Sequence, residues 1–115
     1  MLFRSDLYRA SEVAPALATA KSAIYVLPDA AWSRRASGTF GNELAVAHPE
    51  RAHAVLVTGT DGYTVSVRSP LTDGRGADAV CREFGGGGRE GAAGINRLPA
   101  GDYARFVEVF TRAYG

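Results

Sequence analysis

Residues 53–68 read HAVLVTGTDGYTVSVR, two strand-like runs separated by a short turn. The first run, 53–58, is mostly apolar, which indicates a buried strand. In residues 63–68 apolar and polar side chains alternate, as they do in a strand with one buried face. Between the two runs, Asp61-Gly62 is a typical hairpin signal. The stretch therefore predicts a β-hairpin.

The chain on either side of this hairpin predicts further short elements. Pro15 interrupts the first helical pattern, and it either lies near the start of a helix capped by Ser11 or kinks a longer helix. We expect an α/β protein, a single compact domain with a mixed β-sheet of about four to five strands flanked by helices. Residues 1–22 are interpreted as an N-terminal helix or the remnant of an interdomain connection, and residues 23–115 as the domain itself. Strands are expected over 23–27 and 93–98, and helices over the first twenty residues, 42–47, 77–84 and from Tyr103 onward.

Composition restricts the class of protein. The chain has 115 residues, which suits one domain, and 46% apolar with 22% charged residues is the balance of a globular protein. The net charge is +1, so any phosphate binding has to be local rather than driven by an overall field. Cys81 is the only cysteine, which leaves no internal disulfide and fits a cytoplasmic protein. No apolar run is long enough to span a membrane.

Residues 84–94 read FGGGGREGAAG and contain four consecutive glycines. Each ordered glycine costs about 0.5–1 kcal/mol relative to alanine, so the run needs a physical reason. A linker is disfavoured, because only about thirty residues follow and they are too few for another domain. Two interpretations stay open. The run is a tight structural turn, or it is a backbone nest whose N–H groups converge on an anion, helped by a helical turn at 89–93 and by Arg89.

Three segments occur together in an order and at a spacing that resemble the DHH-associated domain, the C-terminal half of DHH-family phosphoesterases. The resemblance covers residues 23–115, and Asn42-Glu43-Leu44-Ala45 is similar to a segment of some members. The three segments are Val65-Ser66-Val67-Arg68-Ser69 at a strand end, the short helix 77–84, and the four glycines 85–88 followed by Ala92-Ala93-Gly94.

The resemblance implies a division of labour between two domains. In such enzymes an N-terminal DHH domain holds two divalent metal ions, usually Mn²⁺ (or Mg²⁺), which activate water to hydrolyse phosphodiester or pyrophosphate bonds. The DHH-associated domain binds the substrate. We therefore expect this chain to bind a nucleotide, a short oligonucleotide or another phosphorylated substrate, with no cofactor and no catalytic residue of its own.

No Asp-His-His signature occurs in the sequence, so we expect the chain to be a fragment of a longer enzyme and to be inactive alone. Its expected partner is then the DHH domain of the same protein. A stand-alone domain starting at Met1 stays open, as does a homodimer of the parent enzyme.

The resemblance assigns substrate binding to two arginines, a serine and the glycine run. The family's run usually ends in histidine, whereas this sequence has Arg89, which is always charged and cannot shuttle protons. The substrate class therefore stays open, and so does an ion pair of Arg89 with Glu83 or Glu90. For Arg68 the alternative is a solvated side chain. The expected substrate-binding residues are Arg68, Ser69, Gly85, Gly86, Gly87, Gly88 and Arg89.

Four other residues receive structural interpretations. Asn42 is expected to cap a helix rather than face the cleft. Cys81 lies on the apolar stripe of its helix and is expected in the core. His53 is expected to be a structural histidine whose ring nitrogens are hydrogen-bonded, and Trp32 a core residue rather than a platform for stacking a base.

Two rival functions remain beside the phosphoesterase interpretation. One is a non-catalytic nucleic-acid-binding module, as at the C-terminus of alanyl-tRNA synthetases, which predicts a broad basic surface. The other is a purely structural glycine turn without a ligand. It predicts glycine N–H groups that are paired internally or that do not converge.

Overall fold

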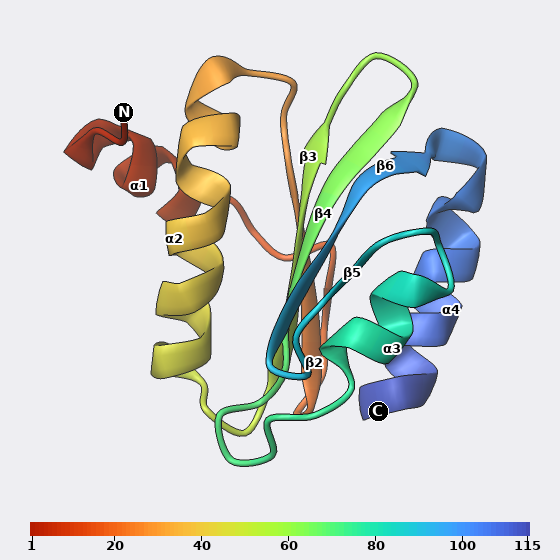
Figure 1. Ribbon diagram of the computed structural model, residues 1–115. Helices are drawn as coiled ribbons and strands as arrows, with labels where there is room; N and C mark the ends of the chain where they lie inside the picture. Colours follow the sequence, from red (N-terminus) through yellow and green to blue (C-terminus); the bar gives the residue numbers. More distant parts are fainter.

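Six strands form one mixed sheet, in the order β1-β2-β3-β4-β6-β5, in the computed structural model, which describes residues 1–115 (Figure 1). The strands are β1 (Leu17–Ala18), β2 (Ser22–Leu27), β3 (Ala52–Thr58), β4 (Gly62–Arg68), β5 (Gly87–Gly88) and β6 (Ala92–Pro99). The helices are α1 (Arg4–Ser11), α2 (Ala31–Ala47), α3 (Ala77–Arg82), the 3-10 turn η1 (Ala100–Asp102) and α4 (Tyr103–Tyr114). The α/β class is confirmed. The sheet exceeds the expected four to five strands because β1 and β5 are two-residue edge strands, too short to leave a periodic pattern.

The predicted hairpin forms the centre of this sheet. β3 and β4 pair antiparallel, with Thr58 opposite Tyr63 and His53 opposite Arg68. β2 and β3 are parallel and are connected through α2, as a parallel pair requires. On the other side β4 pairs antiparallel with β6, which places Arg68 beside Ala92. The register thus brings the end of β4 to the start of β6.

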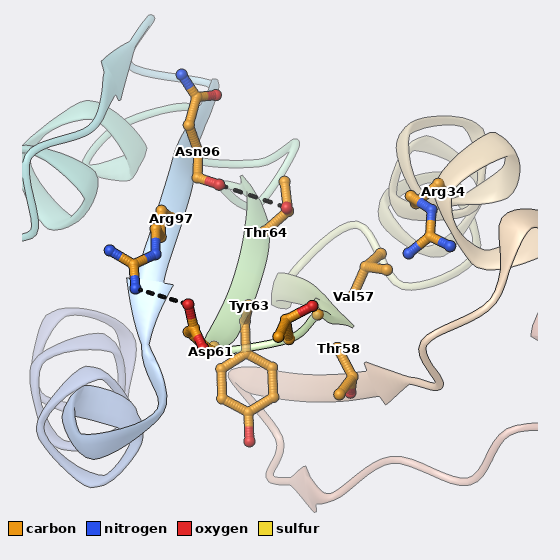
Figure 2. Close-up of a pocket in the computed structure, with 11 residues that line it drawn as sticks. Arg34, Val57, Thr58, Asp61, Tyr63, Thr64, Asn96 and Arg97 are labelled. Carbon is orange, nitrogen blue, oxygen red and sulfur yellow. Dashed lines mark hydrogen bonds and ion pairs between the residues drawn. The ribbon is translucent and has the colours of Figure 1, made fainter.

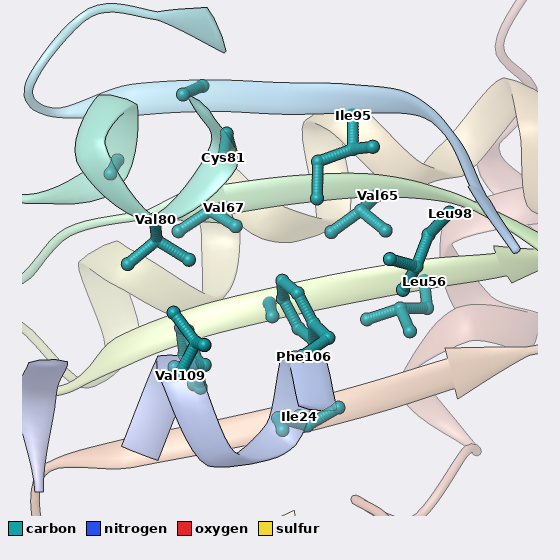
Figure 3. Packing of buried hydrophobic residues seen from close by; sticks show 14 of the residues in the cluster. Ile24, Leu56, Val65, Val67, Val80, Cys81, Ile95, Leu98, Phe106 and Val109 are labelled. Carbon is teal, nitrogen blue, oxygen red and sulfur yellow. The ribbon is translucent and has the colours of Figure 1, made fainter. Parts of the chain in front are cut away.

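The helices cover both faces of the sheet. α2 lies against one face, and α3 and α4 lie against the other (Figure 1). Along β3 the side chains alternate between the two sides: Leu56 belongs to the core beneath α3 and α4, whereas Val55 belongs to a smaller core beneath α2. The larger core has 15 buried residues, and Phe106 and Phe110 of α4 are fully buried in it. Figure 3 shows Phe106 packed among residues of this core. The helix expected from Tyr103 onward is confirmed.

Helix α2 is much longer than the predicted segment 42–47, and it spans 17 residues. Its first half contains Ser33, Gly38 and Thr39, which are weak helix formers, and no side chain caps its N-terminus. Packing compensates for this weak local preference. Phe40 is buried against the sheet, and its ring packs edge-on against that of Tyr25, with 5.4 Å between the ring centroids.

Helix α1 is shorter than the predicted twenty residues and ends at Ser11. Pro15 explains the difference, since proline cannot donate an N–H to a helix and disfavours the helical conformation in the residue before it. The helix is fastened to α2 by a bidentate ion pair: Arg35 donates from Nε and Nη2 to the carboxylate of Asp6 at 2.9 and 3.0 Å. This interaction lowers the pKa of Asp6, which is almost fully buried, to about 2.

None of the helices is long and apolar enough to cross a membrane. The only cysteine, Cys81, is fully buried in the larger core, as expected, and burial raises the pKa of its thiol to about 11. Trp32 packs against the smaller core beneath α2, which confirms the core interpretation.

His53 is also fully buried, and neither of its ring nitrogens has a hydrogen-bond partner. Burial, together with the charges of Arg51 and His48, lowers its pKa to about 4. An ordinary histidine in the unfolded chain titrates near pH 6.5. The folded protein therefore binds this proton less readily than the unfolded chain does.

We predict that acid weakens the fold through His53. Its contribution is complete above pH 6.5 and is lost as the pH falls towards 4, by about 2–3 kcal/mol in the free energy of unfolding. Asp6 titrates lower still and adds its own loss below about pH 4. Urea unfolding at pH 7, 5.5 and 4.5 measures the slope, that is, how steeply the free energy of unfolding falls with pH. The variant His53→Gln should flatten it, whereas His48→Gln, at an exposed position, should not; equal slopes in all three proteins would contradict the assignment.

Candidate functional site

The glycine run first ends helix α3. The N–H of Gly86 donates to the carbonyl of Cys81 at 2.9 Å, and the N–H of Gly85 donates to that of Arg82 at 3.2 Å. This pair of hydrogen bonds is the Schellman arrangement of a helix C-terminus. It requires a left-handed residue, and Gly85 has φ = +80°. The first glycine is therefore needed to turn the chain out of the helix.

The next glycines run along the sheet. Gly87 and Gly88 form β5 and pair with Gly94 and Ala93 of β6. The preceding residue, Gly86, approaches β6 so closely that a Cβ added there would overlap the carbonyl oxygen of Gly94. A side chain at this position would separate the two segments.

The amides at both ends of the glycine run are paired within the chain. The amides of Gly85 and Gly86 donate within the chain, and the amide of Arg89 donates to the carbonyl of Ala92 at 2.9 Å. Residues 89–91 form a hairpin turn between β5 and β6 rather than the start of a helix, and Ala92 and Ala93 already belong to β6. These three N–H groups are thus unavailable to an anion, and the glycines act here as close-packing backbone.

The same hairpin turn borders a hollow of about 390 Å³ between the C-terminal half of α2 and the ends of β4 and β6. Its volume lies within the range of small-molecule sites, roughly 300–1,000 Å³. Its lining combines two cationic side chains, polar groups and exposed aliphatic side chains. The lining residues are Asn42, Ala45, Val46, Arg68, Ser69, Leu71, Arg89, Gly91 and Ala92.

Arg68 is held across the hollow by α2. Its Nε donates to Oδ1 of Asn42 at 2.8 Å, and its Nη1 donates to the carbonyl of Val67 at 3.3 Å. The hydrocarbon part of the side chain passes over Gly41, where an added Cβ would lie 3.6 Å from Cγ of Arg68. Nη2 has no partner within the chain. One edge of the guanidinium is therefore fixed, and the other is free to bind.

Asn42 does not cap a helix, and this expectation was wrong because α2 continues through it from Ala31 to Ala47. The residue instead lines the hollow and contacts Arg68 directly. Since its Oδ1 accepts from a guanidinium, its NH₂ group is left as a donor, and that group has no partner within the chain.

Arg89 supplies a second positive charge close to the first. Its side chain is exposed, and it forms no ion pair, either with Glu83 or with Glu90. Glu83 instead lies 3.8 Å from Arg105. Burial, followed by the charge of Arg89, lowers the pKa of Arg68 below its ordinary value, and arginine remains charged nonetheless.

Ser69 joins the end of β4 to the hairpin turn. Its amide donates to the carbonyl of Gly91 at 3.0 Å and its hydroxyl donates to the same oxygen at 3.3 Å. The residue is almost fully buried. Its main effect is to hold Gly91, and with it the turn that carries Arg89, against β4.

Most arginines elsewhere are neutralised. Seven of the chain's twelve arginines form ion pairs with aspartate or glutamate. A second hollow, of about 220 Å³, lies at the opposite end of β4 beside the β3–β4 turn (Figure 2). Its two cations are paired, Arg34 with Asp29 at 2.9 Å and Arg97 with Asp61 at 3.3 Å. Spare positive charge therefore distinguishes the first hollow from the second.

The structure brings together only part of the expected set. Arg68, Ser69 and Arg89 share the hollow, whereas Gly85, Gly86, Gly87 and Gly88 do not line it. Sequence reasoning missed Val46 and Leu71, whose only sequence signal is an apolar residue at an exposed helix end and in a turn. No group of three or more His, Cys, Asp or Glu side chains is arranged to hold a metal ion.

The fold is similar to that of solved structures, including three that are each less than 25% identical to this chain. An exopolyphosphatase-related protein from Bacteroides fragilis matches with a TM-score of 0.66 and 20% identity, over 98% of this chain and 35% of that one. The C-Ala domain of alanyl-tRNA synthetase from Aquifex aeolicus matches with a TM-score of 0.61 and 16% identity, over 80% of this chain and 88% of that domain. A pGpG-specific phosphodiesterase from Vibrio cholerae matches with a TM-score of 0.56 and 11% identity, over 95% and 38%.

These likenesses confirm the fold implied by the resemblance to the DHH-associated domain. No protein-family model matches the sequence, and no curated protein matches it either. The chain spans about a third of the length of the exopolyphosphatase-related protein and 38% of that of the phosphodiesterase.

We predict that Gly86 and Gly87 differ sharply in their tolerance of a side chain. Gly86→Ala should lower the free energy of unfolding by about 1–3 kcal/mol, because the new Cβ pushes β5 away from β6. Gly87→Ala should change it by less than about 0.5 kcal/mol, since nothing lies within 4 Å of an added Cβ. Urea unfolding of both variants measures the difference. Equal losses would show that β5 does not lie against β6 as described.

Proposed function

We propose that this chain is the substrate-binding domain of a DHH-family phosphoesterase and that it binds the phosphate of its substrate in the hollow between α2, β4 and β6. One observation carries the proposal: Arg68 and Arg89 face the same hollow, and neither has a carboxylate partner. Two like charges held together repel each other, and an anion bound between them relieves that repulsion.

The donors in the hollow suit a phosphate group. Arg68 has a free Nη2, Arg89 has an unpaired guanidinium, and Asn42 has a free NH₂ group, which together offer several donors around one space. Guanidinium groups bind phosphate oxygens through paired, charge-assisted hydrogen bonds. Because Asn42 fixes the Nε edge of Arg68, less side-chain entropy is lost when the phosphate binds.

The hydrolytic step belongs, on this proposal, to a separate DHH domain. That domain would hold the Mn²⁺ or Mg²⁺ ions that the resemblance implies, since this chain's own acidic residues and histidines do not gather into a metal site. On this proposal the residues of this chain bind the substrate and take no part in the hydrolysis. Alone, it should bind phosphorylated ligands weakly and hydrolyse nothing.

A second candidate function is supported by the likeness to the C-Ala domain, which covers 88% of that domain. On this alternative the chain is a nucleic-acid-binding module without catalysis. It requires cations spread over a surface, and the ion pairing of seven arginines speaks against it.

We predict that each of the two arginines is needed for phosphate binding. In calorimetric titrations with pyrophosphate, Arg89→Ala and Arg68→Met should each weaken binding about 10- to 100-fold, as expected for the loss of charge-assisted hydrogen bonds. Methionine keeps the packing of the Arg68 side chain over Gly41. Arg9→Ala is the matched control, because Arg9 is exposed, has no ion pair and does not line the hollow.

Equal weakening by all three variants would show that binding is a general charge effect and would refute the site. An affinity that rises steadily with the length of a single-stranded oligonucleotide, with a steep salt dependence, would favour the nucleic-acid module instead.

A further inference from the structure

The phosphate-binding hollow has an apolar wall that a phosphate alone would not use. Val46 and Leu71 line the hollow, yet their side chains are 71% and 61% exposed. They are two of only six large hydrophobic residues that the chain leaves exposed. Three of the others lie at the N-terminus and the fourth, Tyr8, lies on α1, so these two stand apart as a pair.

The two aliphatic side chains come from different elements and meet at the same space. Val46 lies in the last turn of α2, one helical turn after Asn42, which holds Arg68. Leu71 follows the end of β4, three residues after Arg68. The cations and the aliphatic side chains are therefore parts of one lining.

A ligand that fills this site has a phosphate next to a flat apolar group. Inorganic phosphate and pyrophosphate would satisfy the arginines and leave Val46 and Leu71 in water. A nucleoside monophosphate would place its base against them and so remove their apolar surface from water. No aromatic side chain lines the hollow, so the base would be held by aliphatic contact rather than by stacking, with little preference among bases.

We propose that Val46 and Leu71 are specificity-determining residues that make this site selective for nucleotides over base-free phosphates. The inference rests on the proposed function, since it needs the phosphate to bind at Arg68 and Arg89. It commits the site to a nucleoside phosphate, and it excludes inorganic pyrophosphate as the preferred ligand.

The test compares three probes on the full chain by titration calorimetry: adenosine monophosphate, ribose 5-phosphate and pyrophosphate. We expect the nucleotide to bind about tenfold more tightly than ribose 5-phosphate, which has the same phosphate and sugar without the base. Val46→Ser and Leu71→Ser should reduce this ratio to near one and leave the affinity for ribose 5-phosphate unchanged within twofold. Both positions are exposed, so the variants should fold, and Leu2→Ser serves as a control at an exposed leucine outside the hollow.

Two results would overturn the inference in distinguishable ways. Equal binding of the nucleotide and ribose 5-phosphate, with both weakened by Arg89→Ala, would refute the selectivity and leave the phosphate site intact. No binding of any of the three probes at millimolar concentration would refute the phosphate site and, with it, the inference built on it.

Discussion

The close approach of Gly86 to Gly94 is the contact on which the site depends. Because no side chain separates the two backbones, β5 lies flat against β6 and the chain returns through a tight turn at residues 89–92. Ser69 then ties this turn to the end of β4 through the carbonyl of Gly91. The glycine run therefore helps to position Arg89 beside Arg68, and the amides of Gly85, Gly86 and Arg89 are already paired within the chain.

Arg68 and Arg89 differ from most other arginines of the chain because neither forms an ion pair. A net charge of +1 conceals an uneven distribution, because most arginines are neutralised by a neighbouring carboxylate and the two in the hollow are not. Surface ion pairs contribute little stability, usually below about 1 kcal/mol, so their value here is mainly that they remove competing cations. The proposed anion site therefore depends on two local charges and needs no overall basic field.

The parts of the fold that follow from local patterns were predictable from the sequence. The central hairpin was predictable from alternating apolar and polar residues and an Asp-Gly turn. The last helix was predictable from aromatic residues at helical spacing. Helix α2 was underestimated because its glycines and hydroxyl residues conceal a helix that tertiary packing stabilises. The edge strands β1 and β5 were not predicted because a strand of two residues is too short to show an alternation of apolar and polar side chains.

The candidate site was only partly predictable for the same reason. Arg68 and Arg89 were identified through a resemblance, and the structure brings them together. The pairing of the Gly85, Gly86 and Arg89 amides within the chain was not predictable, since sequence cannot tell whether a run of amides already has acceptors. Val46 lies at a helix end and Leu71 in a turn 25 positions further on. No local sequence pattern predicts that these two residues line the same hollow.

The most direct test of the central claim is to follow the arginine Nε–Hε resonances by NMR while pyrophosphate is added. Those of Arg68 and Arg89 should move together at the same ligand concentration, because one phosphate contacts both guanidinium groups. Those of Arg34 and Arg97, which are engaged with aspartates in the second hollow, should stay in place. Shifts spread evenly over all the arginines, or no shift at Arg68 and Arg89 at millimolar pyrophosphate, would contradict a phosphate site built by these two residues.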